Sequence, residues 1–157
     1  MESEKIIEHF YQSFATGDAE KMVGCYHDQI EFTDPAFGLL KGEAAKNMWR
    51  MLLEGAKGKI KIEFSNVSAD NETGSAQWIA TYQFSETGRK VVNKITAHFE
   101  FKDGKIFRHT DSFDLHKWAK QALGFKGVLL GGTKYFQNKL QQKTSLRLAK
   151  YSSRKKE

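Results

Sequence analysis

Cysteine and long apolar runs are scarce in this sequence. The single cysteine, Cys25, excludes an internal disulfide framework and favours a reducing compartment. No stretch approaches the roughly 20 apolar residues that a helix needs to cross a bilayer. The acidic start of the chain, residues 1–5, lacks the apolar run of a secretory signal. We therefore expect a soluble, cytoplasmic protein without a transmembrane segment. Its 157 residues are enough for one domain with a substantial hydrophobic core.

Positive charge is concentrated at one end of the chain. The formal net charge is +6, yet residues 134–157 hold eight Lys/Arg and one acid, whereas residues 1–133 hold 17 Lys/Arg and 18 acids. The basic character belongs to a tail, and the body is close to neutral. The body shows no basic face with interleaved aromatic residues, so we expect no specific nucleic-acid binding. The tail would solubilise the chain or dock on a partner.

The apolar pattern changes from a helical period to a period of two near residue 59. Three helices are expected: one ending at Gly17, one beginning after Asp18, and one between Gly42 and Gly55, with a short strand at residues 30–34. Alternating apolar residues then predict four strands, at about residues 60–64, 76–84, 91–101 and 105–113. Helices followed by antiparallel strands with one apolar face indicate an α+β fold, a curved sheet with helices on its concave side.

A helical extension is expected after the last strand. The glycine-rich stretch at residues 124–132 is too irregular for a phosphate-binding loop. Thr133 then begins a helix with a narrow apolar stripe from Phe136 to Tyr151, which needs a surface to lie on, either its own sheet or a second subunit. We expect three parts: the domain at residues 1–116, the extension at residues 117–151, and a basic, frayed tail at residues 152–157.

The last strand carries two ionisable residues on an apolar face. Because side chains alternate along a strand, Phe107, His109, Asp111 and Phe113 are expected to share one face. Burying a charge without partners costs several kcal/mol. His109 and Asp111 therefore need each other, a turn or exposed surface, or the polar end of a ligand cavity.

The hairpin before this strand decides what faces the pair. A two-residue turn would place His109 opposite His98, whereas a three-residue loop with a bulge would pair His109 with Ala97 and Asp111 with Ile95. Only the second register places the apolar residues of both hairpin strands on the same face of the sheet. We therefore prefer it, and it sends His98 to the opposite face.

Five short motifs follow one another along the chain: Phe14 with Gly17 and Asp18; Tyr26, His27 and Asp28; Phe32 with Asp34 and Pro35; Gly42; and Phe101 with Asp103 to Ile106. In this order they resemble the ketosteroid isomerase and SnoaL-like polyketide cyclase group of the nuclear transport factor 2-like (NTF2-like) superfamily. The resemblance covers roughly residues 4–116. It implies a cone of strongly curved antiparallel sheet closed by helices, with a deep cavity and, commonly, a homodimer.

The resemblance also suggests roles for individual residues. Asp34 matches the carboxylate that ketosteroid isomerases use to move a proton between carbons. Their oxyanion hole is a tyrosine and a protonated aspartate, and the matching positions here hold Phe10 and Ala97. A steroid isomerase in the strict sense is therefore not expected. His109 and Asp111 resemble the polar pair that SnoaL-like members use or retain in the cavity.

Each of these residues also has a purely structural interpretation. Asp34 precedes a proline and could simply accept backbone N–H groups in a turn. If Asp34 instead faces an apolar cavity, burial raises its pKa towards neutrality, as a general base requires. His109 and Asp111 are either a satisfied interior pair or an acid–base dyad.

Aromatic and polar residues complete the expected site. The expected ligand-binding residues are Phe14, Trp49, Trp78, Tyr82, Asn93 and Phe113. The aromatic members could equally be plain core, while Tyr82 and Asn93 could donate hydrogen bonds to a ligand carbonyl and replace the missing donors. With His98 on the other face, no metal site is expected, and the chemistry considered needs no cofactor.

Two functions fit this pattern. The first is a pocket for a small hydrophobic, cyclic or carbonyl-bearing molecule, with proton abstraction next to the carbonyl in an isomerisation or aldol cyclisation. Asp34 or Asp111 would be the base, and His109 the proton shuttle or oxyanion donor. The second is a non-catalytic ligand-binding or protein-interaction module, which the same fold supports. The missing oxyanion donors favour the module, and the three ionisable residues favour the enzyme.

Overall fold

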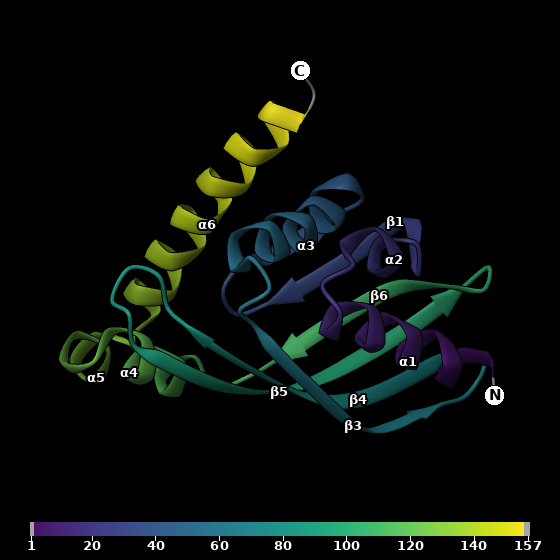
Figure 1. Ribbon diagram of the computed structural model, residues 1–157, viewed down its shortest axis with the longest axis horizontal. Helices are drawn as coiled ribbons and strands as arrows, with labels where there is room; N and C mark the ends of the chain where they lie inside the picture. The colour runs from purple at the N-terminus through teal and green to yellow at the C-terminus, as the bar shows by residue number, and fades with distance from the viewer. Residues whose placement is uncertain (1, 156–157) are drawn as a thin grey trace.

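The computed structural model describes residues 2–155 and contains six helices and six strands within them. The helices are α1 (Glu2–Ala15), α2 (Ala19–Val23), α3 (Glu43–Ala56), α4 (Leu115–Leu123), α5 (Phe125–Leu130) and α6 (Lys134–Lys155). The strands are β1 (Tyr26–Asp34), β2 (Gly38–Lys41), β3 (Lys61–Ala69), β4 (Thr73–Gln83), β5 (Lys90–Lys102) and β6 (Lys105–Ser112). Figure 1 shows α1 and α3 over the sheet, with α4 and α5 at one end and α6 slanting away past α3. None of the helices in this part of the chain is long and apolar enough to cross a membrane.

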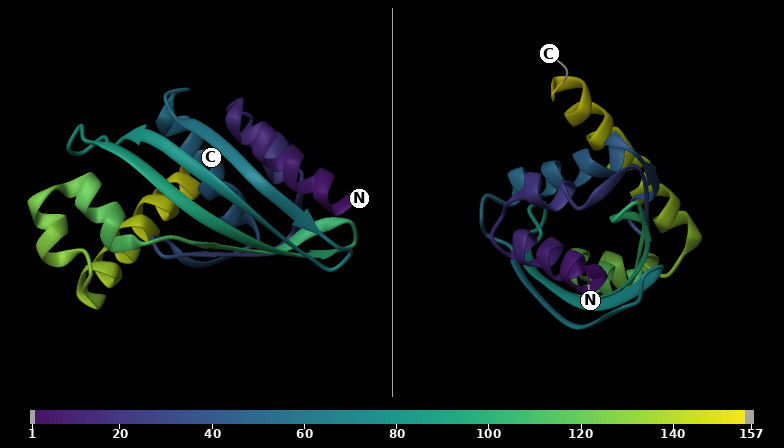
Figure 2. Two further views of the ribbon diagram at one scale, coloured as in Figure 1. Left: turned by 90° about the horizontal axis from the view of Figure 1, so that it is seen from below. Right: turned by 90° about the vertical axis from the view of Figure 1, so that its right-hand side faces the viewer.

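All six strands form one sheet, in the order β2-β1-β6-β5-β4-β3. The sheet curves around α1, and α3 closes the open side, as the end-on view in Figure 2 shows. The α+β cone is therefore confirmed. The sheet is mixed rather than purely antiparallel, because β1 runs parallel to β6 while every other neighbouring pair is antiparallel.

The β5–β6 hairpin differs from the preferred register. Lys102 pairs with Lys105 across a two-residue turn whose residues both have positive φ, 54° at Asp103 and 72° at Gly104, as a type I′ turn requires. Phe107 is then an extra residue on β6, and the β5–β6 register shifts by one beside it. The expectation of a three-residue loop was wrong, because the bulge lies inside the strand rather than in the turn.

This bulge sets the partners of the two ionisable residues. His109 lies opposite Phe99, and Asp111 lies opposite Ala97. The predicted face was right, while the predicted partners were wrong by two residues along β5. Phe107 leaves that face, since its ring lies under the Lys102 and Arg108 side chains at 5.0 and 5.6 Å.

The core lies between the concave face of the sheet and the two covering helices. Phe10 and Phe14 on α1 pack edge-on against Trp49 of α3, with ring centroids 5.7 and 5.2 Å apart, and Phe14 also contacts Trp78 of β4. Aromatic pairs of this kind contribute about 0.5–1.5 kcal/mol each beyond their buried area. They hold α1 and α3 against the sheet and so fix the walls of the space between them.

The extension begins with α4, which packs on the β4–β5 hairpin. Thr87 Oγ1 donates to the Ala122 carbonyl at 2.6 Å, and the Val92 amide donates to the Gln121 side chain at 2.7 Å. The glycine-rich stretch, for which no helix was expected, contains α5. Gly127 allows this helix to approach α4, because a Cβ there would lie 1.9 Å from the Ala119 carbonyl oxygen.

Helix α6 lies along α3 of the same chain. Asn47 donates to Ser152 Oγ at 3.2 Å, and the Tyr151 hydroxyl donates to the Glu54 carboxylate. Closer to the start of α6, Thr144 donates to the carbonyl of Ala36, between β1 and β2, at 2.9 Å. The helix continues through Lys155, so residues 152–155 of the expected tail are helical. Residues 156–157 of that tail lie outside the described part of the chain.

Candidate functional site

A small cavity of about 110 Å³ lies inside the cone, between α1, α3 and the concave face of the sheet. Eight of the nine site residues expected from the sequence line it: Asp34, Asp111, Phe14, Trp49, Trp78, Tyr82, Asn93 and Phe113. The remaining lining is apolar, from Met48, Leu52, Ile60, Ala80 and Ile95. Only His109 is not part of the wall. We call this space the inner cavity.

Asp34 enters the inner cavity from the end of β1. Its Oδ1 accepts the backbone N–H groups of Ala36 and Phe37 at 2.9 and 2.7 Å, which is the turn expected from Asp–Pro. Among the described residues nothing donates to Oδ2. Burial raises the pKa of Asp34 to about 7, although the two backbone N–H groups lower it. Asp34 therefore both accepts the turn hydrogen bonds and lines the cavity.

Asp111 enters the same cavity from β6, and two hydrogen bonds hold its carboxyl group in place. Its Oδ1 accepts from His109 Nε2 at 2.8 Å and from Trp78 Nε1 at 3.4 Å. Oδ2 again receives no hydrogen bond from residues 2–155. Both carboxyl groups thus have one oxygen anchored and one oxygen left for a ligand.

His109 lies behind Asp111 in the core and is fully buried. Its ring packs between Phe32 and Phe99, with centroids 5.0 and 4.5 Å away. Its Nδ1 is 2.7 Å from the hydroxyl of Tyr26. His109 therefore reaches the cavity only through Asp111.

The hydrogen-bond chain beyond His109 determines the proton positions. Trp49 Nε1 can only donate, and it donates to the Tyr26 oxygen at 2.8 Å. The Tyr26 hydroxyl must then donate to His109 Nδ1, which leaves Nε2–H to donate to Asp111. This order fixes the tautomer of the imidazole. Tyr26 was missed as a site residue because its contact with His109 depends on the parallel pairing of β1 with β6.

Two hydrogen-bond donors complete the polar part of the cavity. The Tyr82 oxygen accepts from Trp118 Nε1 of α4 at 2.7 Å, so its own hydrogen is available to a ligand. Burial raises the pKa of Tyr82, which keeps it a neutral donor. Asn93 adds an amide from β5.

The two positions matching the isomerase oxyanion hole are apolar, as expected. Phe10 is fully buried and stacks on Tyr26, and Ala97 is buried opposite Asp111. The neighbouring Tyr11 is also buried, and its hydroxyl is the one side-chain atom in the described residues that is buried without a hydrogen-bond partner. Tyr11 does not line the cavity.

Among residues 2–155, no three His, Cys, Asp or Glu side chains gather closely enough to hold a metal ion. His98 is exposed on the outer face of β5, while His109 is buried on the inner face.

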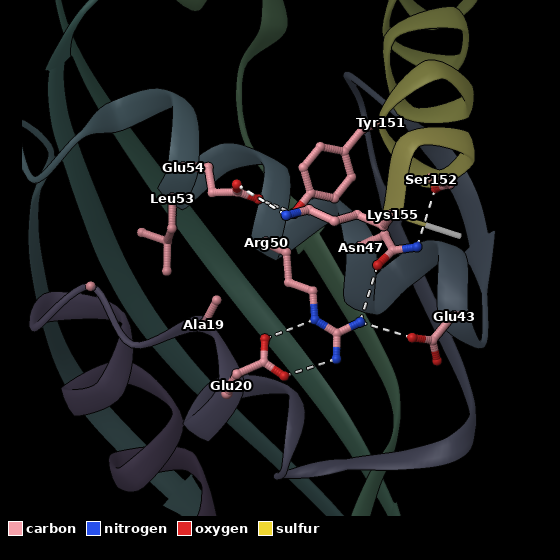
Figure 3. Close-up of a pocket in the computed structure, with 11 residues that line it drawn as sticks. Ala19, Glu20, Glu43, Asn47, Arg50, Leu53, Glu54, Tyr151, Ser152 and Lys155 are labelled. Carbon is pink, nitrogen blue, oxygen red and sulfur yellow. Dashed lines mark hydrogen bonds and ion pairs between the residues drawn. The ribbon is translucent and has the colours of Figure 1, made fainter. Parts of the chain in front are cut away.

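A wider hollow of about 590 Å³ lies at the surface between α2, α3 and α6, and Figure 3 shows its side chains. Arg50 at its centre binds Glu20 through two nitrogens, at 2.9 and 3.1 Å, and Glu43 at 2.8 Å. Glu54 pairs with Lys155 at 3.3 Å. Because its charged groups already bind one another, this hollow fastens the helices together and offers no free charge to a ligand.

Comparison with known proteins places the chain in a family. The model of the SnoaL-like domain matches residues 7–109. Among curated proteins, none matches the chain.

Three solved structures share the fold at low sequence identity. A candidate polyketide cyclase from Xanthomonas campestris is 18% identical, with a TM-score of 0.62 over 76% of this chain and 96% of that one. An NTF2-like protein of unknown function from Burkholderia pseudomallei is 12% identical, with a TM-score of 0.66 over 78% and 98%. An LEH-like epoxide hydrolase from M. tuberculosis is 20% identical, with a TM-score of 0.58 over 83% and 91%. The match of the domain model over most of the cone, together with this shared fold, shows that the chain belongs to the SnoaL-like family within the NTF2-like fold.

Proposed function

We propose that the inner cavity binds the carbonyl end of a small hydrophobic molecule and that Asp34 removes a proton from the carbon next to that carbonyl. The observation that carries this proposal is the pair of carboxyl groups in one apolar cavity, each with Oδ2 free and one with a pKa of about 7. A carboxyl group with that pKa is partly ionised at neutral pH. It can accept a proton and return it, which is the requirement for general acid–base catalysis.

The remaining polar groups suit the other half of the reaction. Removing the proton leaves an enolate oxygen, to which the Tyr82 hydroxyl and the Asn93 amide would donate. The proton on Asp34 then returns to a different carbon in an isomerisation. In an aldol cyclisation, the enolate carbon instead bonds to a second carbonyl carbon, whose oxygen takes the proton. Neither route needs a cofactor.

Asp111 and His109 act as a unit in this proposal. His109 fixes the orientation of Asp111 and lies too deep to contact a ligand, so we assign it a positioning role rather than that of a direct shuttle or oxyanion donor. Asp111 Oδ2 would accept a hydrogen bond from a ligand hydroxyl or take the base role for a substrate bound in the opposite orientation.

The candidate polyketide cyclase among the similar structures supports this reaction class. The alternative is a non-catalytic ligand-binding or protein-interaction module, and the apolar residues Phe10 and Ala97 at the oxyanion positions support it. The alternatives differ in one measurable property, since only the enzyme exchanges the protons next to a bound carbonyl.

The test measures the incorporation of deuterium into cyclopentanone and cyclohexanone in D₂O by NMR. We expect the wild-type protein to accelerate exchange and Asp34→Asn to reduce that acceleration by about 10²-fold or more. Asp28→Asn is the matched control, because Asp28 is almost fully exposed and lies outside the cavity. Binding without exchange would favour the non-catalytic module, and equal exchange by Asp34→Asn would remove Asp34 as the base.

We also propose a homodimer. Helix α5 exposes Phe125 and Leu129, with 75% and 61% of their surface accessible, next to the lysines of the extension. A second copy offers both an apolar cover and the opposite charge, because residues 1–114 hold 18 acids against 14 Lys/Arg.

Phe125→Ser with Leu129→Ser should lower the mass measured by light scattering, while Leu146→Ser on α6 should not. An unchanged mass would place the interface elsewhere or exclude it.

A cytoplasmic location is part of the same proposal. It rests on the single thiol of Cys25, which is free and buried, with its pKa raised by burial to about 11.

A further inference from the structure

A second cavity, of about 310 Å³, lies between the cone and the helical extension. We call it the outer chamber. Its walls are almost entirely apolar and come from both parts of the molecule: Phe37, Leu52 and Phe84 from the cone, and Trp118, Phe136 and Leu140 from the extension. More than half of the residues that line it therefore lie outside residues 7–109, the segment that matches the SnoaL-like domain.

The outer chamber adjoins the inner cavity. Leu52 lines both spaces, so the two adjoin at its side chain. The hydrogen bond from Trp118 to Tyr82 joins a wall of the outer chamber to a wall of the inner cavity. Phe37, in the outer chamber, also donates its backbone N–H to Asp34.

The volumes indicate how a ligand would use the two spaces. Pockets for drug-sized ligands measure about 300–1,000 Å³. The inner cavity, at about 110 Å³, is well below that range, and the outer chamber, at about 310 Å³, reaches it. The inner cavity can therefore take only the reacting end of a molecule, while the outer chamber has room for an apolar body.

The rim of the outer chamber is positively charged. Lys139, Lys143 and Arg147 line it from α6, against one acidic residue, Glu86. Glu86 already binds both Lys143, at 2.5 Å, and Arg147. Lys139 has no ion pair among the described residues, and its Nζ lies 5.7 Å from the ring of Tyr135. This rim favours an anionic group and disfavours a cationic one.

We propose that the outer chamber binds the apolar body of an elongated organic anion, with its carboxylate at Lys139 on the rim and its other end directed into the inner cavity. The ligand class is a monocarboxylate with an extended or fused-ring apolar body. The position of a reactive carbonyl in the inner cavity rests on the proposed function, whereas anion binding in the outer chamber does not.

The direct test is calorimetric titration with three straight-chain probes that have different head groups: decanoate, decan-1-ol and decyltrimethylammonium, each below its micelle concentration or solubility limit. The apolar chain of decanoate is one carbon shorter than the other two, so tighter binding of decanoate reports the rim and not the chain. We expect decanoate to bind roughly fivefold or more tighter than decan-1-ol, with the cation weakest, and the preference to shrink as salt is added. Equal affinities for the three probes would overturn the anion assignment.

Two pairs of variants on α6 locate the binding. Leu140→Trp fills the outer chamber and should reduce decanoate affinity at least tenfold, whereas Leu146→Trp, on the exposed face, should leave it unchanged. Lys139→Gln should remove most of the preference for decanoate over decan-1-ol, and Lys150→Gln, also exposed on α6 but outside the chamber, should not. The lysine pair alters only exposed side chains, so it remains informative if Leu140→Trp folds poorly.

Asp34→Asn separates this inference from the proposed function. The variant should bind decanoate like the wild type while losing deuterium exchange of ketones. If wild-type affinity survives Leu140→Trp and the head-group preference survives Lys139→Gln, the outer chamber is not the site, whatever the exchange experiment shows.

Discussion

The cone, residues 2–113, and the helical extension, residues 115–155, differ in where they place ionisable side chains. The cone buries His109 and Asp111 with 0% and 3% of their surface accessible, inside a network of specific partners. The extension keeps its charged side chains at the surface, and they are all positive: residues 115–155 hold ten Lys/Arg and no acid. The buried ionisable pair thus belongs to the cone, and the extension adds exposed positive charge.

Apolar side chains show the opposite distribution. Most of the large apolar residues left exposed belong to the extension: Phe125, Val128, Leu129, Leu130, Tyr135 and Leu146. A region that covers the cone on one face and remains apolar on another is suited to contacts beyond its own domain. Under the proposed function, the cone would carry out the reaction and the extension would select what reaches it.

The largest effect should follow from breaking the buried network of the cone. His109→Ala leaves the Tyr26 hydroxyl and Asp111 buried without their partner, so we expect a loss of about 3–5 kcal/mol in the free energy of unfolding, measured with urea. His98→Ala, on the exposed face of β5, should change it by less than about 0.5 kcal/mol. Equal effects of the two substitutions would mean that the network contributes little.

The next largest effect concerns pH and Asp34. Its folded pKa, about 7, is above its ordinary value of 3.8. Between these values the folded state binds the proton more tightly than the unfolded state, so stability is greatest below about pH 4 for this group and falls as the pH rises through 7. Asp34→Asn keeps an oxygen for the two backbone N–H groups and removes the ionisation.

We therefore expect Asp34→Asn to stabilise the protein at pH 8 by roughly 2–4 kcal/mol relative to its effect at pH 4. Unfolding curves at the two pH values measure this difference. A variant whose stability follows that of the wild type at both would show that Asp34 is not held in an apolar environment.

A smaller effect should be confined to the extension. In Gly127→Ala the new Cβ would overlap the Ala119 carbonyl, so α5 must move away from α4 at a cost of roughly 1–3 kcal/mol. Gly55→Ala is the control, because nothing lies within 4 Å of a Cβ there and alanine favours the helix. Hydrogen exchange should increase in α4 and α5 and remain unchanged in α1 and β6. Increased exchange throughout the cone would mean that the two regions unfold as one.

The smallest effect should come from the ion pairs that join α6 to the β4–β5 loop. Glu86→Gln removes the partner of Lys143 and Arg147, both about half exposed, so we expect less than about 1 kcal/mol of destabilisation at low salt. The effect should shrink in 1 M NaCl. A loss that persists at high salt would show that packing, not charge, holds α6 at this point.

Much of the cone could be predicted from local pattern. The period-two segments gave β4, β5 and β6, and the alternation along β6 placed His109 and Asp111 on the inner face. Short-range rules were sufficient there because adjacent strands in a hairpin pair through nearby residues.

What could not be predicted depends on contacts between distant residues. The parallel pairing of β1 with β6 joins segments about 80 residues apart, and it brings Tyr26 to His109. The alternation of apolar and polar residues along β6 does not distinguish a bulge at Phe107 from a longer turn. Helix α5 was missed because glycine disfavours helices in general, whereas Gly127 is needed here for close packing on α4.

The central claim is that an apolar cavity holds Asp34 as a carboxyl group able to exchange protons near neutral pH. An NMR titration of its side-chain carboxyl carbon tests this most directly, with Asp34→Asn to assign the resonance. We predict a pKa of about 7. A value near the unperturbed 3.9 would contradict the account and leave Asp34 as a turn residue.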